Sequence, residues 1–63
     1  MTELSENAKL VIDSLETQPA LNTPALIAQN EGIDRADAEQ GLDELLAIGR
    51  VKQRPTGWKL VGD

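Results

Sequence analysis

Four basic side chains lie close together near the C-terminal end of the chain. They are Arg50, Lys52, Arg54 and Lys59. The first three alternate with other residues, so in a β-strand they would share one face, opposite Val51. Guanidinium and ammonium groups in such a row can contact successive phosphate oxygens. This segment is therefore a candidate surface for binding a polyanion.

A purely structural role for these bases is also open. Strands at the edge of a sheet often carry Lys and Arg because charge prevents pairing with other chains. The bases could also pair with acidic side chains of the preceding segments. If they do bind phosphates, four contacts at most predict weak binding by a single copy and a shallow dependence on salt.

A second group of polar residues falls between positions 35 and 44. Arg35 and Gln40 could contact base edges through paired hydrogen bonds. Beside them lie Glu39, Asp43 and Glu44, whose carboxylates would repel a phosphate backbone, each at about 0.5 kcal/mol across water. These three acids could instead bind a basic protein partner or a second copy of the chain.

The charge is divided unevenly along the chain. Its 6 basic and 11 acidic residues give a net charge of −5. Residues 1–49 contribute −8 from ten acids and two bases, and residues 50–63 contribute +3 from four bases and one acid. An acidic chain is atypical of a general binder of nucleic acid or anionic membranes. Any contact with phosphates is therefore expected at the basic end.

The composition argues against catalysis and against a metal or cofactor site. Cysteine and histidine are both absent, which removes thiolate nucleophiles, common metal ligands and the side chain best suited to proton transfer near neutral pH. Asp37, Asp43 and Glu44 fall at surface positions of a helix, with nothing to bury them. We expect no enzyme, metal or cofactor. The N-terminus opens with acid and no apolar stretch is long, so we expect no membrane span and a cytoplasmic location.

The first element is predicted to be a helix over residues 4–17. Its apolar residues recur at helical spacing: Leu4, Ala8, Val11, Ile12 and Leu15. Thr2 or Ser5 can cap its start through a side-chain oxygen. Gln18 must end it, because the residue before Pro19 is driven out of the helical region.

A short second helix is predicted over residues 24–31. Thr23 offers a capping hydroxyl, and Pro24 suits the first position because its missing N–H would be unpaired there anyway. Gly32 supplies the positive φ that ends the helix. The residues expected to point inward are Leu26 and Ile27.

A third helix is predicted over residues 34–48. Asp34 is its expected cap, Asp37 complements the helix dipole in the first turn, and Gly49 ends it. Ile33, just before it, is expected in the core. The expected buried residues of the helix are Ala38, Leu42, Leu45 and Leu46.

The remaining segment is predicted to be a β-hairpin over residues 50–61. Its apolar residues alternate with polar ones, and residues 54–57 have the composition of a turn. We expect Trp58, the one aromatic residue, to close the hairpin over the first and third helices. Stacking on a nucleic-acid base is the alternative role for this indole.

Three passages resemble the winged helix-turn-helix family. Residues 23–28 (TPALIA) are similar to its T-x-x-E-L-A second helix, and residues 42–51 resemble its L-x-x-L-x-x-x-G-x-V passage from third helix to first wing strand. Residues 54–60 look like a wing tip and return strand. The resemblance implies a single domain over 1–63, α+β but mostly α: a three-helix bundle with a C-terminal two-stranded hairpin, the wing.

The resemblance also implies a function. In DNA-binding members of this family the third helix lies in the major groove, while the wing touches phosphates or the minor groove. We therefore expect a small transcriptional regulator, or a part of a larger nucleoprotein assembly, that binds double-stranded DNA. The alternative is a protein-interaction module that uses the acidic helical face without binding DNA. A homodimer is compatible with both.

Overall fold

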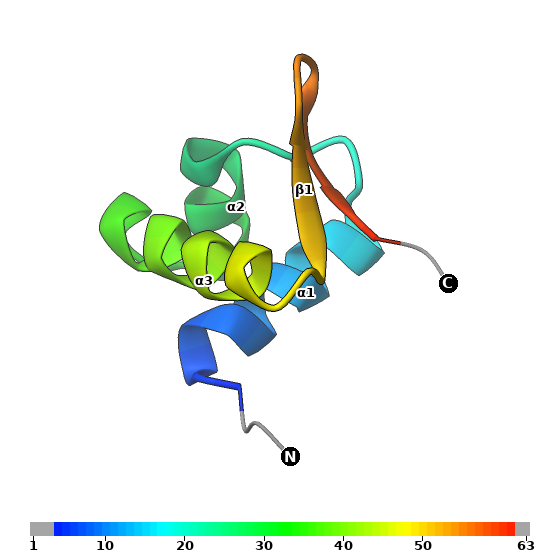
Figure 1. The fold of residues 1–63 in the computed structure, drawn as a ribbon. Coiled ribbons are helices and arrows are strands. Elements are labelled where there is room, and N and C mark those ends of the chain that lie inside the picture. The colour runs from blue at the N-terminus through cyan, green and yellow to red at the C-terminus, as the bar shows by residue number, and fades with distance from the viewer. Residues whose placement is uncertain (1–3, 62–63) are drawn as a thin grey trace.

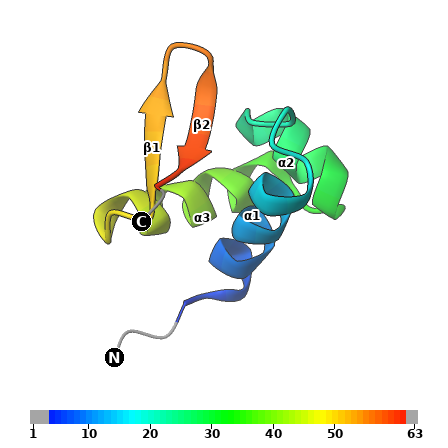
Figure 2. The ribbon, with the colours of Figure 1, turned by 90° about the vertical axis from the view of Figure 1, so that its right-hand side faces the viewer.

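The computed structural model describes residues 4–61, which form three helices followed by a two-stranded antiparallel hairpin (Figure 1). The elements are α1 (Glu6–Thr17), α2 (Pro24–Glu31), α3 (Arg35–Ala47), β1 (Val51–Arg54) and β2 (Gly57–Leu60). The helices pack on one another, and the loop of the hairpin projects beyond them (Figures 1 and 2). The predicted class, mostly α with a C-terminal hairpin in the winged helix-turn-helix order, is confirmed.

Helix α1 begins two residues later than predicted because Ser5 is its cap. The Ser5 Oγ accepts a hydrogen bond from the Ala8 backbone N–H at 3.2 Å. The helix ends at Thr17, just before Gln18 and Pro19, as the proline predicts. Its buried side carries Ala8, Val11, Ser14 and Leu15.

Helix α2 starts and ends where the sequence predicts. Thr23 Oγ1 accepts from the Leu26 N–H at 3.3 Å, and Gly32 adopts φ 70 at the other end. Of the two residues predicted to point inward, Ile27 is fully buried, but the prediction for Leu26 is wrong because its side chain is 37% exposed. The buried side is centred on Ile27 and Ala28, and Leu26 is turned about 100° from Ile27 around the helix.

Helix α3 differs from the prediction at its cap and on its buried side. Asp34 is the N-cap residue, but its side chain makes no capping hydrogen bond. Leu46, expected to be buried, is 46% exposed. Gly41 is buried instead, because α1 passes so close that a Cβ there would lie 2.7 Å from the Asn7 carbonyl oxygen and 2.8 Å from Val11 Cγ2. At this position the backbones of α1 and α3 are therefore in direct contact.

The wing is attached to the helices at both strands. Val51 on β1 is buried in the core, and Leu60 on β2 packs against it. The Trp58 backbone N–H donates to the Asn22 carbonyl oxygen at 2.8 Å, so the link between α1 and α2 lies along the outer edge of β2. The Val61 N–H donates to the Arg50 carbonyl at 2.8 Å and extends the hairpin by one pair.

The core lies between the three helices and the base of the wing. Its buried members are Ala8, Val11, Leu15, Ile27, Ala28, Ala38, Leu42, Leu45 and Val51. Ile33 and Trp58 pack against this cluster while part of each stays exposed, so the indole does contribute to the core. Across residues 4–61 no helix combines the length and apolar character needed to cross a membrane.

Candidate nucleic-acid interface

The register of the hairpin brings the four predicted bases to one face. Lys52 lies directly opposite Lys59, and Arg54 lies opposite Gly57. Residues alternate between the two sides of a strand, so Arg50, one pair beyond β1, falls on the same side. We call these four residues, Arg50, Lys52, Arg54 and Lys59, the outer face of the wing. The inner face carries Val51, Gln53, Trp58 and Leu60.

Like charges on the outer face are not neutralised by acids of the described chain. Within residues 4–61 the only ion pair joins Arg35 to Glu39, so the pairing of wing bases with helical acids does not occur there. All four bases are exposed. Like charges directly opposite in a hairpin destabilise it. Lys52 and Lys59 therefore form a site where a bound anion would lower the electrostatic energy.

The structure does not bring Arg35 and Gln40 together. Both are exposed, but they lie about 140° apart around α3, five residues along a helix. The Arg35 Nε donates to Glu39 Oε2 at 3.1 Å. Gln40 turns toward α1, where its Oε1 accepts from the Asn7 amide at 2.9 Å. The Arg35 Nε and the Gln40 Oε1 are thus already engaged, and these bonds hold the two side chains on different sides of α3.

The three acids of the predicted partner-binding face, Glu39, Asp43 and Glu44, do not form one surface either. Glu44 lies against the start of α1, where its Oε2 accepts from the Ser5 backbone N–H at 2.9 Å. The hydrogen bonds from Ser5 lower the pKa of Glu44. Glu44 therefore joins α3 to the cap of α1, while Glu39 and Asp43 stay exposed on the side of α3 that faces the wing.

A groove runs between α3 and the inner face of the wing. Its lining residues are Pro24, Arg35, Glu39, Leu42, Asp43, Gln53 and Trp58, and its volume is about 430 Å³. Leu42 is the buried floor, while the carboxylates of Glu39 and Asp43 stand at the α3 side. We call it the inner groove. The sequence identified Glu39 and Asp43 but missed Gln53, although strand alternation places Gln53 on the same side as the buried Val51.

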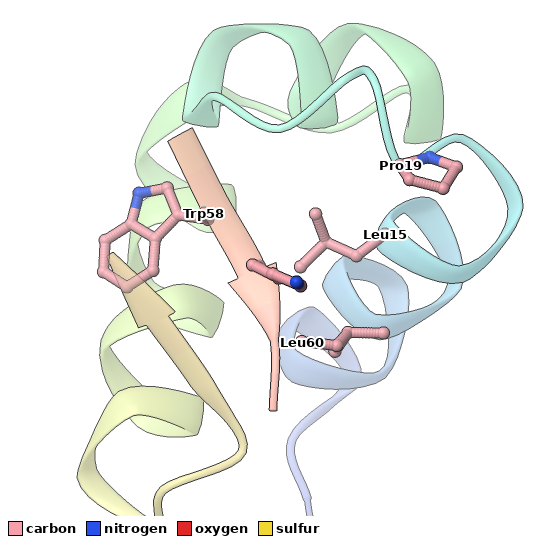
Figure 3. Close-up of a pocket in the computed structure, with 5 residues that line it drawn as sticks. Leu15, Pro19, Trp58 and Leu60 are labelled. Carbon is pink, nitrogen blue, oxygen red and sulfur yellow. The ribbon is translucent and has the colours of Figure 1, made fainter. Parts of the chain in front are cut away.

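A smaller, mostly apolar hollow of about 180 Å³ lies between the end of α1 and β2. Leu15, Pro19 and Leu60 line it on the α1 side, and the indole of Trp58 lies toward β1 (Figure 3). Lys59 is also part of its lining. Trp58 thus contributes to hollows on both sides of β2, which leaves its indole accessible as well as packed.

The turn end of the wing is held by a contact that the sequence did not reveal. A Cβ on Gly57 would collide with the side chain of Asn22, whose Nδ2 would be 2.8 Å away. Gly57 also adopts φ 131, a conformation that side chains rarely allow. Asn22 therefore sets the position of β2 through its side chain as well as through its backbone bond to Trp58. This contact orients the outer face relative to the helices.

Comparisons of the chain with protein-family models, curated proteins and solved structures gave no match. The function is therefore argued from the surfaces described above.

Proposed function

We propose that this chain is a winged helix-turn-helix module that binds double-stranded DNA mainly through the outer face of its wing. The observation that carries the proposal is the opposition of Lys52 and Lys59 with no acid of the described chain paired to either. Arg50 and Arg54 continue this positive row on the same side. A phosphate placed between two ammonium groups relieves their repulsion, and duplex DNA supplies phosphates in series.

In this proposal α3 contributes less than the wing. Arg35 and Gln40 remain the candidates for base contacts, but the bonds to Glu39 and Asn7 hold them on different sides of α3. Glu39 and Asp43 on the same helix would meet DNA phosphates with like charge. We therefore expect affinity that varies little with base sequence. Such a module would act as a small regulator or within a larger nucleoprotein assembly that supplies further contacts.

The proposal is tested by titrating a labelled duplex of about 20 base pairs at a series of salt concentrations. Four phosphate contacts predict a slope of log K against log salt no steeper than about −4. The double variant Lys52→Gln, Lys59→Gln should weaken binding and reduce the slope by about two. Lys9→Gln is the matched control, because Lys9 is an exposed lysine on α1, away from the wing; it should change affinity less than about twofold.

Two results would count against wing-led binding. One is the absence of any complex at low salt with a long duplex. The other is a loss of affinity per charge removed that is the same for the Lys52 and Lys59 double variant as for Lys9→Gln. That result would indicate attraction to the overall charge of the protein, without a defined binding surface.

A further inference from the structure

The inner groove has a chemistry opposite to that of the outer face. Its volume of about 430 Å³ exceeds that of two other hollows next to Trp58, which measure about 180 and 260 Å³. The two smaller hollows include Lys59 in their lining. The inner groove instead carries two carboxylates and one guanidinium, and that guanidinium is already bonded to Glu39.

Asp43 is the unengaged charge of this groove. Its side chain is exposed and makes no hydrogen bond or ion pair with any residue between 4 and 61. Trp58 forms part of the facing wall, and the negative face of an indole attracts cations. The groove therefore repels phosphate and favours a positively charged side chain.

We infer that the inner groove binds an arginine side chain from a basic segment of a partner protein. A guanidinium is planar, so it can lie against the indole of Trp58 while its N–H groups form a fork with the carboxylate of Asp43. Gln53 adds an amide oxygen that can accept from a further N–H. An ammonium group carries the same charge but cannot make both the stacked and the forked contact.

The size and shape of the groove agree with this occupant. Its volume falls in the range of sites that hold small ligands. One side chain fills only part of that space, which leaves room for the neighbouring residues of an extended segment. The inference goes beyond DNA binding and uses no base of the outer face. A failure of one proposal therefore leaves the other untouched.

Trp58 is the only tryptophan of the chain and lines the groove, so its emission responds to an occupant there, and the Asp43→Asn variant assigns the response to the groove. We would titrate the whole chain with an acetylated, amidated tetra-arginine peptide at physiological salt and follow the indole emission. The expected result is a saturable change, with several-fold weaker binding of the matched tetra-lysine peptide. Asp43→Asn should weaken the arginine peptide about tenfold, as expected for one lost charge-assisted hydrogen bond. Glu16→Gln, which removes the same charge from an exposed site outside the groove, should change it less than twofold.

Several outcomes would overturn the inference. Equal weakening by Asp43→Asn and Glu16→Gln would show general attraction to an acidic protein. Equal affinity for the arginine and lysine peptides would remove the guanidinium assignment. No emission change up to millimolar peptide, with the protein folded by circular dichroism, would exclude the groove as the site. A rise in mass with protein concentration that Asp43→Asn abolishes would assign the groove to a second copy instead.

Discussion

Gly57 and Asn22 touch so closely that only a residue without a side chain fits at position 57. Because φ at Gly57 is 131, the position is unfavourable for other residues even without the contact. We expect Gly57→Ala to destabilise the protein by about 1–3 kcal/mol. Denaturant unfolding measures this, with Thr56→Ala in the exposed turn as control. Combining Gly57→Ala with Asn22→Ala should restore only the part of the lost stability that the collision causes. Full restoration would show that the backbone conformation at position 57 has no energetic cost for alanine.

The neighbouring leucines at the end of α3 differ sharply in burial. Leu45 is fully buried, whereas Leu46 is 46% exposed. Leu45→Ala should therefore cost about 2–5 kcal/mol, through lost transfer energy and the cavity that remains. Leu46→Ala should cost about 1 kcal/mol or less. Chemical denaturation of the two variants, side by side, tests which side of α3 faces the core; equal losses would contradict the packing described here.

Two carboxyl groups, Asp13 and Glu31, meet where α1 and α2 pack. Burial, a hydrogen bond with Asp13 and the charge of Asp13 together raise the pKa of Glu31. A carboxyl with a raised pKa supports folding fully below its unfolded value of about 4.3, and this support is lost as pH rises through the folded value. Glu31→Gln should therefore raise the thermal midpoint at pH 7 and leave it nearly unchanged below about pH 4.

The same pair can be tested by a double-mutant cycle. Asp13→Asn removes the other side of the interaction and should also raise the midpoint at pH 7. If the two groups act on each other, the double variant gains less than the two single gains together. Strict additivity would mean that Asp13 does not act on Glu31.

Glu44 has the opposite pH dependence. Its pKa is lowered by the hydrogen bonds from Ser5. Such a group contributes stability above its unfolded pKa, and the contribution is lost as pH falls through the folded value. Glu44→Gln should lower the thermal midpoint near pH 7, and the difference should close in acid. Asp43→Asn, one residue earlier and without a partner within residues 4–61, is the control and should leave the midpoint almost unchanged.

Local signals in the sequence predicted the elements well. Thr23, Pro24 and Gly32 mark both ends of α2, and Ser5 is one of the two residues that the sequence offers as a cap for α1. Periodicity is a weaker guide where two apolar residues are adjacent, and there it predicts Leu26 and Leu46 as buried although both are exposed. Gly41 could not be identified as buried, because its role depends on how closely α1 and α3 approach.

The candidate surfaces were predictable only in part. Alternation along β1 placed Arg50, Lys52 and Arg54 together, but the position of Lys59 depends on the register of the hairpin. The bond between Glu44 and Ser5 joins residues 39 apart in sequence, so no local pattern indicates it. Arg35 and Gln40 are five residues apart, so they lie about 140° apart around α3, and their contacts with Glu39 and Asn7 lie on different sides of the helix.

Because the projecting wing is basic and the helices are acidic, the molecule has a large electric dipole. With +3 on residues 50–63 and −8 on the preceding residues, a nearby polyanion exerts a torque that turns the hairpin toward it and the helices away. Copies held side by side on one polyanion would then present their helical bodies to each other. Those bodies repel, so occupancy of adjacent positions should be anticooperative at low salt and approach independence as screening increases.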